Sequence, residues 1–472
     1  MTRNVGLARS TGWITFLVVA LAGCAVGPAP QPPAVQSVGL DEHFRLSLGS
    51  TATTPVAEWW SSFADPTLQS LIESTMAANT DLEIATQRLR QARAGLVAAQ
   101  GGLLPTLGLS VGRSHTAADA PQPAIDSTSA SLTVAYDVDL FGGHRRALTG
   151  AQADRRSAAD NRRAVQIALA AEVAINYVSA RAAVNRLQLA QANLAAQQET
   201  LQIVRWRAMA GLAGDVEVAQ ATQLAANTQA GLPDLQQTFD AAVNRLATLS
   251  GEPPARIAGQ LGSDAHIPVA PFPEVALPVD VLRQRPDVRA AEQSVVAELA
   301  RVGVREASVL PGLTLGGSYA GIGRNWSAAT ASPALQLSAL LAGSVFRGGQ
   351  DWAALESQKA TAAVAAANYR GVVRSAMEEL ENALGSARAS VAKETALAEA
   401  DTAAQQAMSL ARLRYQSGLI DFPSLLDVER TALSSQLSLS QARADRAIAA
   451  IRLYKAVGGG WPGAAGAPAA SE

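Results

Sequence analysis

The chain contains few of the residues from which common functional sites are built. Cysteine occurs once in 472 residues, at Cys24, which excludes disulfides within the chain and thiolate metal sites. The four histidines, at positions 43, 115, 144 and 266, are scattered, with no second ligand at metal-binding spacing. A net charge of -2 gives no electrostatic attraction to nucleic acid, and no phosphate-binding loop occurs. We therefore expect no catalysis, no metal and no cofactor.

Aromatic residues are also scarce, at 4% of the chain. Alanine, in contrast, runs through most of the long periodic stretches. Small side chains suit closely packed helices better than a large globular core. The composition therefore favours an elongated architecture with long helices.

The first 23 residues have the pattern of a secretory signal peptide. Arg3 and Arg9 supply a positively charged region, and WITFLVVALA at 13–22 supplies an apolar core. This core is too short to span a bilayer, so we expect residues 1–23 to be a signal peptide and not an anchor helix.

The end of that segment, Leu-Ala-Gly-Cys at 21–24, resembles a bacterial lipobox, in which the cysteine becomes the lipidated first residue of the mature protein. Ala25 stands where inner-membrane retention signals usually place Asp, so the resemblance implies a palmitate-bearing lipoprotein of the outer membrane, anchored at Cys24. The alternative is a plain secretory peptide with an incidental thiol. Residues 24–60 are expected to form a proline-rich tether and a packing segment that includes Trp59 and Trp60.

The body of the chain is a tandem repeat with a shift of 206 positions, and with one further residue inserted Gly211 falls on Gly418. Identical pairs under this shift include Asp81 and Asp287, Pro105 and Pro311, and Gly142 and Gly348. We expect two copies of one helix, strand, strand, helix, helix unit, at residues 61–251 and 285–461. Residues 252–284 are then a proline-rich linker, and residues 462–472 a disordered tail.

Each repeat contains two segments with strict every-other-residue alternation. In TLGLSVG, for example, Leu107, Leu109 and Val111 project to one side and small residues to the other. The predicted strands span about 106–113, 130–140, 312–321 and 334–345. Strands that are apolar on one side only have the pattern of transmembrane barrel strands.

Four strands cannot close a membrane barrel, since the smallest closed barrels use about eight. An open edge in lipid leaves backbone groups that cannot reach water. The sequence therefore predicts a mixed α and β membrane protein that forms a homotrimer, in which three sets of four strands close a 12-stranded outer-membrane β-barrel.

Two stretches of about 65 residues, 145–210 and 351–415, contain no proline and are predicted to be single helices. At about 1.5 Å per residue each would be roughly 90 to 100 Å long, close to the depth of a periplasm. Each ends at a short break and returns as a shorter helix, which predicts long helical hairpins with their tips far from the strands.

The breaks suggest which residues end and begin the helices at each tip. Gly211 and Gly418 suit the position just after a helix C-terminus, and Asp215 and Ser424 are predicted to cap the returning helices.

At this point the chain resembles a known family over nearly its whole mature length. The stretches WWSSFADPTLQSLIESTMAANTDLEIATQRLRQARA, YDVDLFGGHRR, LRQRPDVRAAEQ, LRYQSG, LLDVER and YKAVGGGW carry the resemblance by their order and spacing. They are similar to the TolC-like outer-membrane factors, specifically the NodT-type lipoproteins of resistance-nodulation-division efflux systems. The resemblance implies a homotrimeric export channel whose 12-stranded outer-membrane β-barrel is continued by a long periplasmic α-helical barrel. Such a channel meets a periplasmic adaptor and, through it, an inner-membrane drug transporter.

The resemblance also implies a gate at the inward-facing tip, within LLDVER. We expect Asp427 to contribute to an acidic ring, with Arg430 one turn further on and able to pair with it or with a neighbour. Pro423 stands where relatives often carry a bulky apolar gate residue. The first repeat has Val216 and Gln220 at the places matching Pro423 and Asp427, so the ring would come from the second repeat only. The alternative is that Asp427 is a solvated residue on a helix face.

Adaptor contact is implied at the small residue of each tip, Gly211 and Gly418. Both glycines are equally interpretable as ordinary helix caps. Ala208 of the first repeat matches Tyr415 of the second, so the two tips need not bind alike.

Three functions remain in view. The first is an outer-membrane duct for drug efflux, and the second is the duct of a type I protein secretion system, which would share the fold and the gate. The third is a structural coiled-coil lipoprotein, for which amphipathic strands have no use. The lipobox and the GGGW ending favour efflux.

Overall fold

The computed structural model describes residues 26–31, 58–117, 125–273, 275 and 278–459. Cys24, the signal peptide and the residues after 459 lie outside the described part. The chain divides into two compact units, which we describe separately. Unit 1 comprises Met1–Ala34, Gln87–Ala159 and Ala290–Gly371, and unit 2 comprises Val35–Thr86, Asp160–Arg289 and Val372–Glu472.

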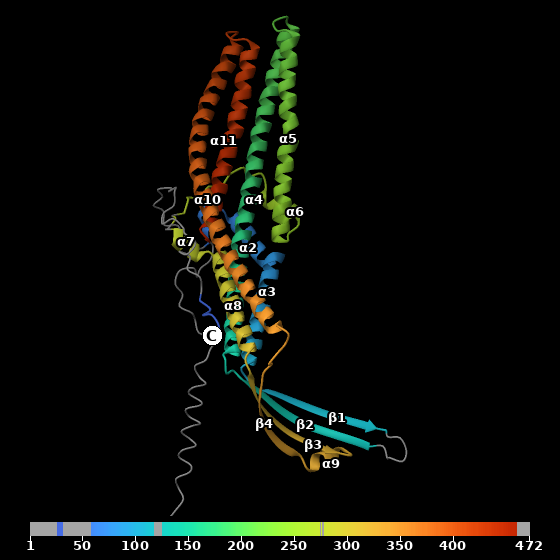
Figure 1. The fold of residues 1–472 in the computed structure, drawn as a ribbon. Coiled ribbons are helices and arrows are strands. Elements are labelled where there is room, and N and C mark those ends of the chain that lie inside the picture. Colours follow the sequence, from blue (N-terminus) through green and yellow to red (C-terminus); the bar gives the residue numbers. More distant parts are fainter. Residues whose placement is uncertain (1–25, 32–57, 118–124, 274, 276–277, 460–472) are drawn as a thin grey trace, which may run out of the picture. The chain divides into compact units, whose positions relative to one another are not determined.

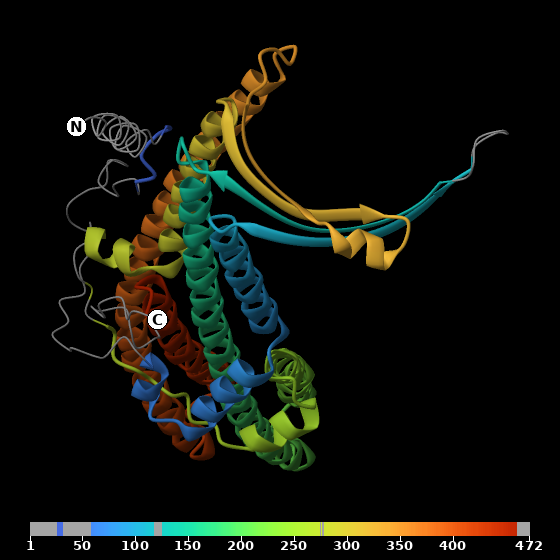
Figure 2. The ribbon, with the colours of Figure 1, turned by 90° about the horizontal axis from the view of Figure 1, so that it is seen from below.

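Unit 1 contains a four-stranded antiparallel sheet, drawn in cyan and gold in Figures 1 and 2. Its strands, in spatial as well as chain order, are β1 (Thr106–Thr116), β2 (Ile125–Val138), β3 (Gly312–Gly323) and β4 (Ala334–Ala342). Three of the strands are longer than predicted at one end: β1 and β3 end later, and β2 begins earlier. The fourth, β4, stops three residues short of the predicted end at 345.

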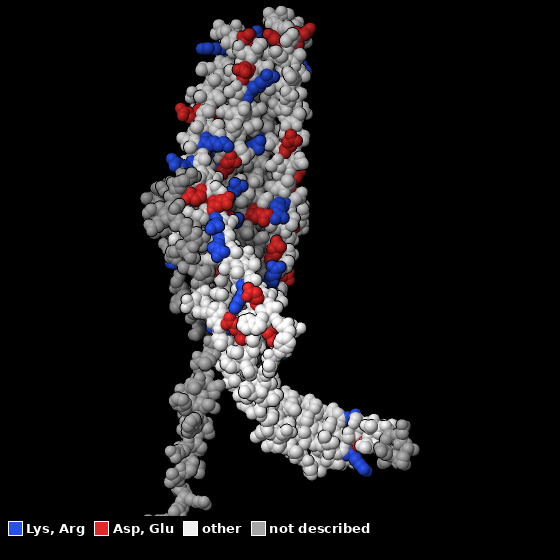
Figure 3. All heavy atoms as spheres, in the orientation of Figure 1, with Lys and Arg blue, Asp and Glu red and all other residues white. Residues whose placement is uncertain are grey.

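The register of the sheet puts most of the large apolar residues of the four strands on one face, with exceptions such as Leu340 and Ile322 on the other. Leu109 lies opposite Leu132, which lies opposite Tyr319, which in turn lies opposite Leu335. Directly opposed residues share a face. Leu109 is 76% exposed and Leu335 is 70% exposed in the single chain. A broad apolar face is thus left without cover, and Figure 3 shows this sheet with few charged side chains in view.

Polar side chains lie on the opposite face. The Ser110 and Ser131 hydroxyls are 2.7 Å apart, as are those of Ser114 and Ser127. These pairs alternate with Leu109 and Leu132, so β1 and β2 separate polar from apolar residues near their middle, whereas Arg113 lies on the leucine face toward the end of β1. The outer edges of β1 and β4 have no strand partner within the described sheet.

The connection between β3 and β4 contains a short helix, α9 (Trp326–Ala331). Asn325 caps it by accepting a hydrogen bond from the Ala328 amide. A Cβ on Gly321 would lie 1.8 Å from the Ala329 carbonyl oxygen, so glycine at that position lets the helix lie against the strand.

Four helices run from one unit into the other: α3 (Thr80–Gly101), α4 (Gly143–Met209), α8 (Pro286–Ser308) and α10 (Gln350–Gln416). The two long ones have 67 residues each, as the proline-free stretches predict. One 18-residue window of α4 is apolar enough to cross a membrane, but 67% of that window is buried inside the chain. Burial of that extent is the property of a core helix.

The remaining elements belong to unit 2: η2 (Trp59–Phe63), α2 (Pro66–Ala78), α5 (Asp215–Ser250), α6 (Pro254–Leu261), α7 (Pro278–Gln284) and α11 (Phe422–Ala456). The first helix of the first predicted repeat is therefore two helices, separated at Asn79, whereas that of the second is the single helix α8. The linker expected at 252–284 contains α6 and α7. Both begin at a proline, which is tolerated in the first turn because its missing N–H would have no partner there.

The main core of unit 2 forms around the aromatic residues that follow the tether. Trp59 is fully buried and stacks on Tyr454 of α11, with ring centroids 5.4 Å apart. Trp60 and Phe63 contact Trp59 edge-on. The prediction that Trp59 and Trp60 pack against the helices is confirmed. Buried aromatic side chains of this size contribute several kcal/mol each, about 3–5 kcal/mol by truncation.

Candidate functional site

Both helical hairpins of unit 2 turn through the same backbone motif. Gly211 and Gly418 each have φ of +70°, a conformation that glycine adopts without strain. The amide of Leu212 donates to the Arg207 carbonyl at 2.7 Å, and the amide of Leu419 donates to the Arg414 carbonyl at 2.8 Å. These bonds satisfy the last carbonyls of α4 and α10 in the Schellman pattern. The expected position of both glycines at the helix ends is confirmed.

The predicted N-caps are wrong. Asp421, not Ser424, caps α11, because its carboxylate accepts a hydrogen bond from the Ser424 amide at 3.1 Å. Hydrogen bonds from Ser424 also hold the pKa of Asp421 below its usual range. Gly214 precedes α5 with no side-chain cap, and Asp215 lies in its first turn. Pro423 fits the first turn of α11, which moves the cap one turn ahead of the predicted position.

The three predicted gate residues, Pro423, Asp427 and Arg430, are all exposed on α11. Asp427 accepts a backbone hydrogen bond from the Thr431 hydroxyl, and its carboxylate forms no ion pair within the described chain. Arg430 lines an open groove of about 580 Å³ beside Asp234 of α5. Asp427 and Arg430 are therefore close in sequence but not paired, and both charges are available to a neighbouring molecule.

A buried ion pair lies on the opposite face of α11 from Asp427. The side chain of Glu429 is 3% exposed, and Arg412 of α10 approaches its carboxylate at 3.2 Å. The Thr200 hydroxyl of α4 lies 3.4 Å from the same oxygen. Burial raises the pKa of Glu429, although Arg412 opposes the shift. Sequence reasoning missed this pair because the acidic residues of LLDVER differ only in which side of the helix they occupy.

Nearer the turn, an apolar cluster joins the two hairpins. The guanidinium of Arg207 lies 4.8 Å from the centre of the Tyr415 ring, and its Nη1 donates to the Tyr415 carbonyl. Tyr415 contacts Phe422 edge-on. The buried members are Leu201, Val204, Ala221, Leu224, Ala411, Tyr415, Phe422, Leu425 and Leu426. Arg207 thus connects α4 to the end of α10.

Several large apolar side chains around the turns have no cover. They are Trp206, Met209, Leu212, Val216, Leu413 and Leu419, each more than half exposed. Soluble surfaces rarely gather so many apolar residues in one region unless something binds there. We call these six residues the tip surface.

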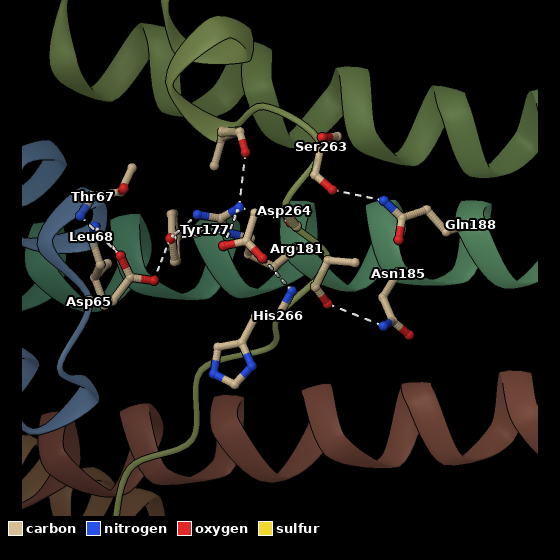
Figure 4. Close-up of polar contacts among 12 residues, drawn as sticks. Asp65, Thr67, Leu68, Tyr177, Arg181, Asn185, Gln188, Ser263, Asp264 and His266 are labelled. Carbon is tan, nitrogen blue, oxygen red and sulfur yellow. Dashed lines mark hydrogen bonds and ion pairs between the residues drawn. The ribbon is translucent and has the colours of Figure 1, made fainter.

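A polar network in unit 2 fixes the segment after α6 to α4 (Figure 4). Asp65 accepts a hydrogen bond from the Thr67 amide through one carboxylate oxygen and from the Tyr177 hydroxyl, at 2.5 Å, through the other. Arg181 donates to the Tyr177 hydroxyl and to the backbone carbonyls of Leu261 and Asp264. Because the Arg181 side chain is 4% exposed, each of these bonds replaces lost hydration. Burial raises the pKa of Tyr177, so this hydroxyl keeps its proton.

A second network surrounds Arg285 at the break between α7 and α8. Its guanidinium lies 2.8 Å from Asp287 and 2.7 Å from Glu379, and it donates to the Ala456 carbonyl at 2.8 Å. Arg285 holds the pKa values of both carboxyl groups below their usual range, despite their partial burial. The stretch LRQRPDVRA therefore joins α7, α10 and the end of α11. Within the described residues, no group of three or more His, Cys, Asp or Glu side chains could hold a metal ion.

We predict that Glu429→Gln weakens the pH dependence of stability. A folded-state pKa above the ordinary 4.5 means that the folded chain binds this proton more tightly than the unfolded chain does. The free energy of unfolding therefore falls as pH rises from about 4.5 through the folded pKa, and glutamine removes that contribution. Thermal midpoints measured by circular dichroism in detergent, from pH 4.5 to 8, would test this.

Glu199→Gln is the matched control, since Glu199 is an exposed carboxylate on α4 near Thr200. Its curve should run parallel to the wild-type curve. If the Glu429→Gln curve also ran parallel, Glu429 would not titrate as its burial implies.

Sequence comparison connects the chain to known proteins. The model of the outer membrane efflux protein family matches residues 71–252 and again residues 277–459. The pyoverdine export outer membrane protein OpmQ of Pseudomonas aeruginosa is 31% identical over 455 residues, which are 93% of this chain and 95% of OpmQ. Nodulation protein T of Rhizobium leguminosarum bv. trifolii is 30% identical over 469 residues, which are 96% of this chain and 98% of that protein.

Solved structures agree in fold. The outer-membrane channel OprN matches with a TM-score of 0.82 at 30% identity, covering 93% of this chain and all of OprN. The open state of the Neisseria gonorrhoeae MtrE outer membrane channel matches with a TM-score of 0.83 at 27% identity, covering 93% of this chain and 98% of MtrE. The fold of mixed helices and strands, the sequence relatives and the twofold match of the family model lead to one conclusion: the chain belongs to the outer membrane efflux protein family.

Proposed function

We propose that this chain is a homotrimeric outer-membrane export channel of a tripartite drug efflux system. It conducts substrates from an inner-membrane pump and a periplasmic adaptor to the outside, and it catalyses no reaction. The observation that carries the proposal is the sheet of unit 1, which combines a continuous apolar face with two unpaired edges.

Lipid is the surrounding that suits this sheet. An apolar face of four strands exposed to water would be a strong aggregation site. Against lipid, the same side chains are not exposed to water and cause no such penalty. In lipid the free edges of β1 and β4 must be paired, because their N–H and C=O groups have no water to bind. Three copies supply the twelve strands of a closed barrel, with polar side chains such as Ser110 and Ser131 lining its interior.

The internal repeat supports the same assembly. The family model matches the two halves of the chain separately, and α4 and α10 have the same length. Two repeats per chain and three chains give six similar units around the ring. At about 1.5 Å per residue, 67-residue helices are about 100 Å long, enough to carry the channel across a periplasm.

The partners follow from the tip surface and from the relatives. An exposed apolar region at the hairpin turns fits the docking of an adaptor hairpin, and Gly211 and Gly418 leave room for its close approach. OpmQ is named for pyoverdine export, and SrpC of Pseudomonas putida for solvent efflux. Cargo of such different chemistry fits a duct that contacts its substrates only in passage.

The gate is proposed at Asp427, with Arg430 and Pro423 on the same exposed part of α11. Three Asp427 carboxylates brought together in a trimer would repel one another and attract cations, since like charges at short range raise the energy of the narrow state. Arg430 of the same or a neighbouring copy can relieve that repulsion. Gln220 at the matching place in the first repeat carries no charge.

The conduction proposal predicts the behaviour of Asp427→Ala. The purified protein should be a trimer by light scattering and should form cation-preferring pores in a planar bilayer. Asp427→Ala should raise single-channel conductance severalfold and reduce cation preference, because the ring of charge is removed. Gln220→Ala is the control and should conduct like the wild type. If Asp427→Ala conducts like the wild type, Asp427 is a solvated surface residue.

The docking proposal predicts that Gly418→Asn impairs export in cells without changing the purified channel. Asparagine tolerates the left-handed conformation better than other residues, so the turn should survive at a cost below the roughly 1–2 kcal/mol of other side chains. The added side chain should obstruct the adaptor and lower resistance to exported compounds. Ser417→Asn, one residue earlier and exposed, should leave resistance unchanged. Equal resistance in both variants would mean that Gly418 only ends the helix and does not contact the adaptor.

The lipid anchor at Cys24 is a further part of the proposal. The intact mass of the mature protein should include acyl chains attached to an N-terminal cysteine, palmitate among them. Cys24→Ser should lack them. A mature wild-type protein that begins after Cys24, or carries no acyl chain, would contradict the lipoprotein assignment.

A further inference from the structure

The sheet also contains enough information to assign the contact between copies residue by residue. We propose that β4 pairs antiparallel with β1 of the next copy of this chain, with Ala339 opposite Arg113 and Ser338 opposite Ser114 of that copy. The inference rests on the proposed trimer and adds its strand register.

The first step is the correspondence between the two repeats within the sheet. Leu109 of β1 corresponds to Leu315 of β3 through the shift of 206 positions. Leu109 lies opposite Leu132 in β2, and Leu315 lies opposite Ala339 in β4. Leu132 therefore corresponds in space to Ala339.

The second step applies the pairing of β2 with β3, where the first repeat meets the second, to β4 and β1 of the next copy. Leu132 of β2 lies opposite Tyr319 of β3, and this is where the first repeat meets the second. Under the same shift, Tyr319 corresponds to Arg113 of β1. In a ring of six similar units, the junction from β4 to the next β1 repeats this geometry. Ala339 then lies opposite Arg113 of the next copy.

The pleat of the strands tests this assignment independently. Ala339 and Leu341 lie on the apolar face, as do Val111 and Arg113, so the proposed register joins apolar face to apolar face. The uninterrupted shift of 206 positions would instead match Leu132 with Ser338. That register would place Ser338 opposite Arg113, and a slip of one residue turns every side chain to the opposite face. The structural correspondence, which differs from the sequence shift by one residue, avoids this conflict.

The register also accounts for side chains that have no cover in the single chain. Leu341 lies opposite Val111 of the next copy, and these are 65% and 59% exposed in the monomer. Continuing along β4 places Val345, which is fully exposed, opposite Leu107. Residues 343–345 have no partner in β3, which begins at Gly312 opposite Ala342. The early end of β4 in the single chain is thus explained if residues 343–345 pair with β1 of another copy.

Disulfide trapping tests the register directly. The double variant Ser338→Cys with Ser114→Cys places two thiols at directly opposed positions on the polar face. Directly opposed Cβ atoms are about 4.5–5.5 Å apart and diagonal ones about 7–8 Å, so only the direct pair is close to disulfide geometry. The oxidised trimer should give covalently linked dimers and trimers in non-reducing denaturing gels.

Two control pairs keep Ser338→Cys and move the second cysteine by two residues on the same face, to Gly112→Cys or Thr116→Cys. Each should cross-link far less. Stronger linkage in a control pair, or no linkage in any pair of a confirmed trimer, would overturn the register while leaving the trimer intact. A monomer by light scattering under reducing conditions would instead contradict the proposed function.

Discussion

The structure depends on the requirement that backbone hydrogen-bonding groups in lipid be satisfied. Within the chain, every adjacent pair in the sheet is antiparallel and in an apolar-to-apolar register, yet β1 and β4 remain open. A water-soluble sheet could solvate those edges, but one with leucines across a whole face has no comparable option. The proposed trimer and the proposed contact between its copies both follow from that requirement.

The helical part meets a different demand, which is to hold long helices in position with few large side chains. It does so with polar networks, each of which joins particular helices and loop segments. Arg181 fixes the segment after α6, Arg285 fixes the break between α7 and α8, and Arg412 joins α10 to α11. The guanidinium groups of Arg181 and Arg285 are buried and would be costly unless fully paired, so these two networks tolerate little displacement of the elements that supply their acceptors.

Local patterns were enough to predict the long helices, the alternating strands and the glycine turns, because period, proline content and positive φ are local properties. They failed where two local signals compete, as at the cap of α11, and where the outcome depends on a tertiary partner. Ser424 has a good capping side chain, but Asp421 occupies the geometry that the following proline sets. Likewise, nothing in LLDVER alone separates buried Glu429 from exposed Asp427, since that difference requires knowing which face of α11 meets Arg412. The offset of one residue between β2 and β4 was visible only in the strand pairing.

The two carboxylate oxygens of Asp65 accept hydrogen bonds from partners at very different distances along the chain. One accepts from an amide two residues away, so α2 can begin as soon as its own first turn forms. The other accepts from Tyr177, which is 112 residues further along the chain and on the far side of both first-repeat strands. Closing so long a loop costs entropy that grows with the logarithm of its length, and long-range contacts form slowly. The same carboxylate therefore makes two kinds of contact. Its hydrogen bond to the Thr67 amide can form early, together with the first turn of α2, whereas its hydrogen bond to Tyr177 can form only after α4 has packed against α2.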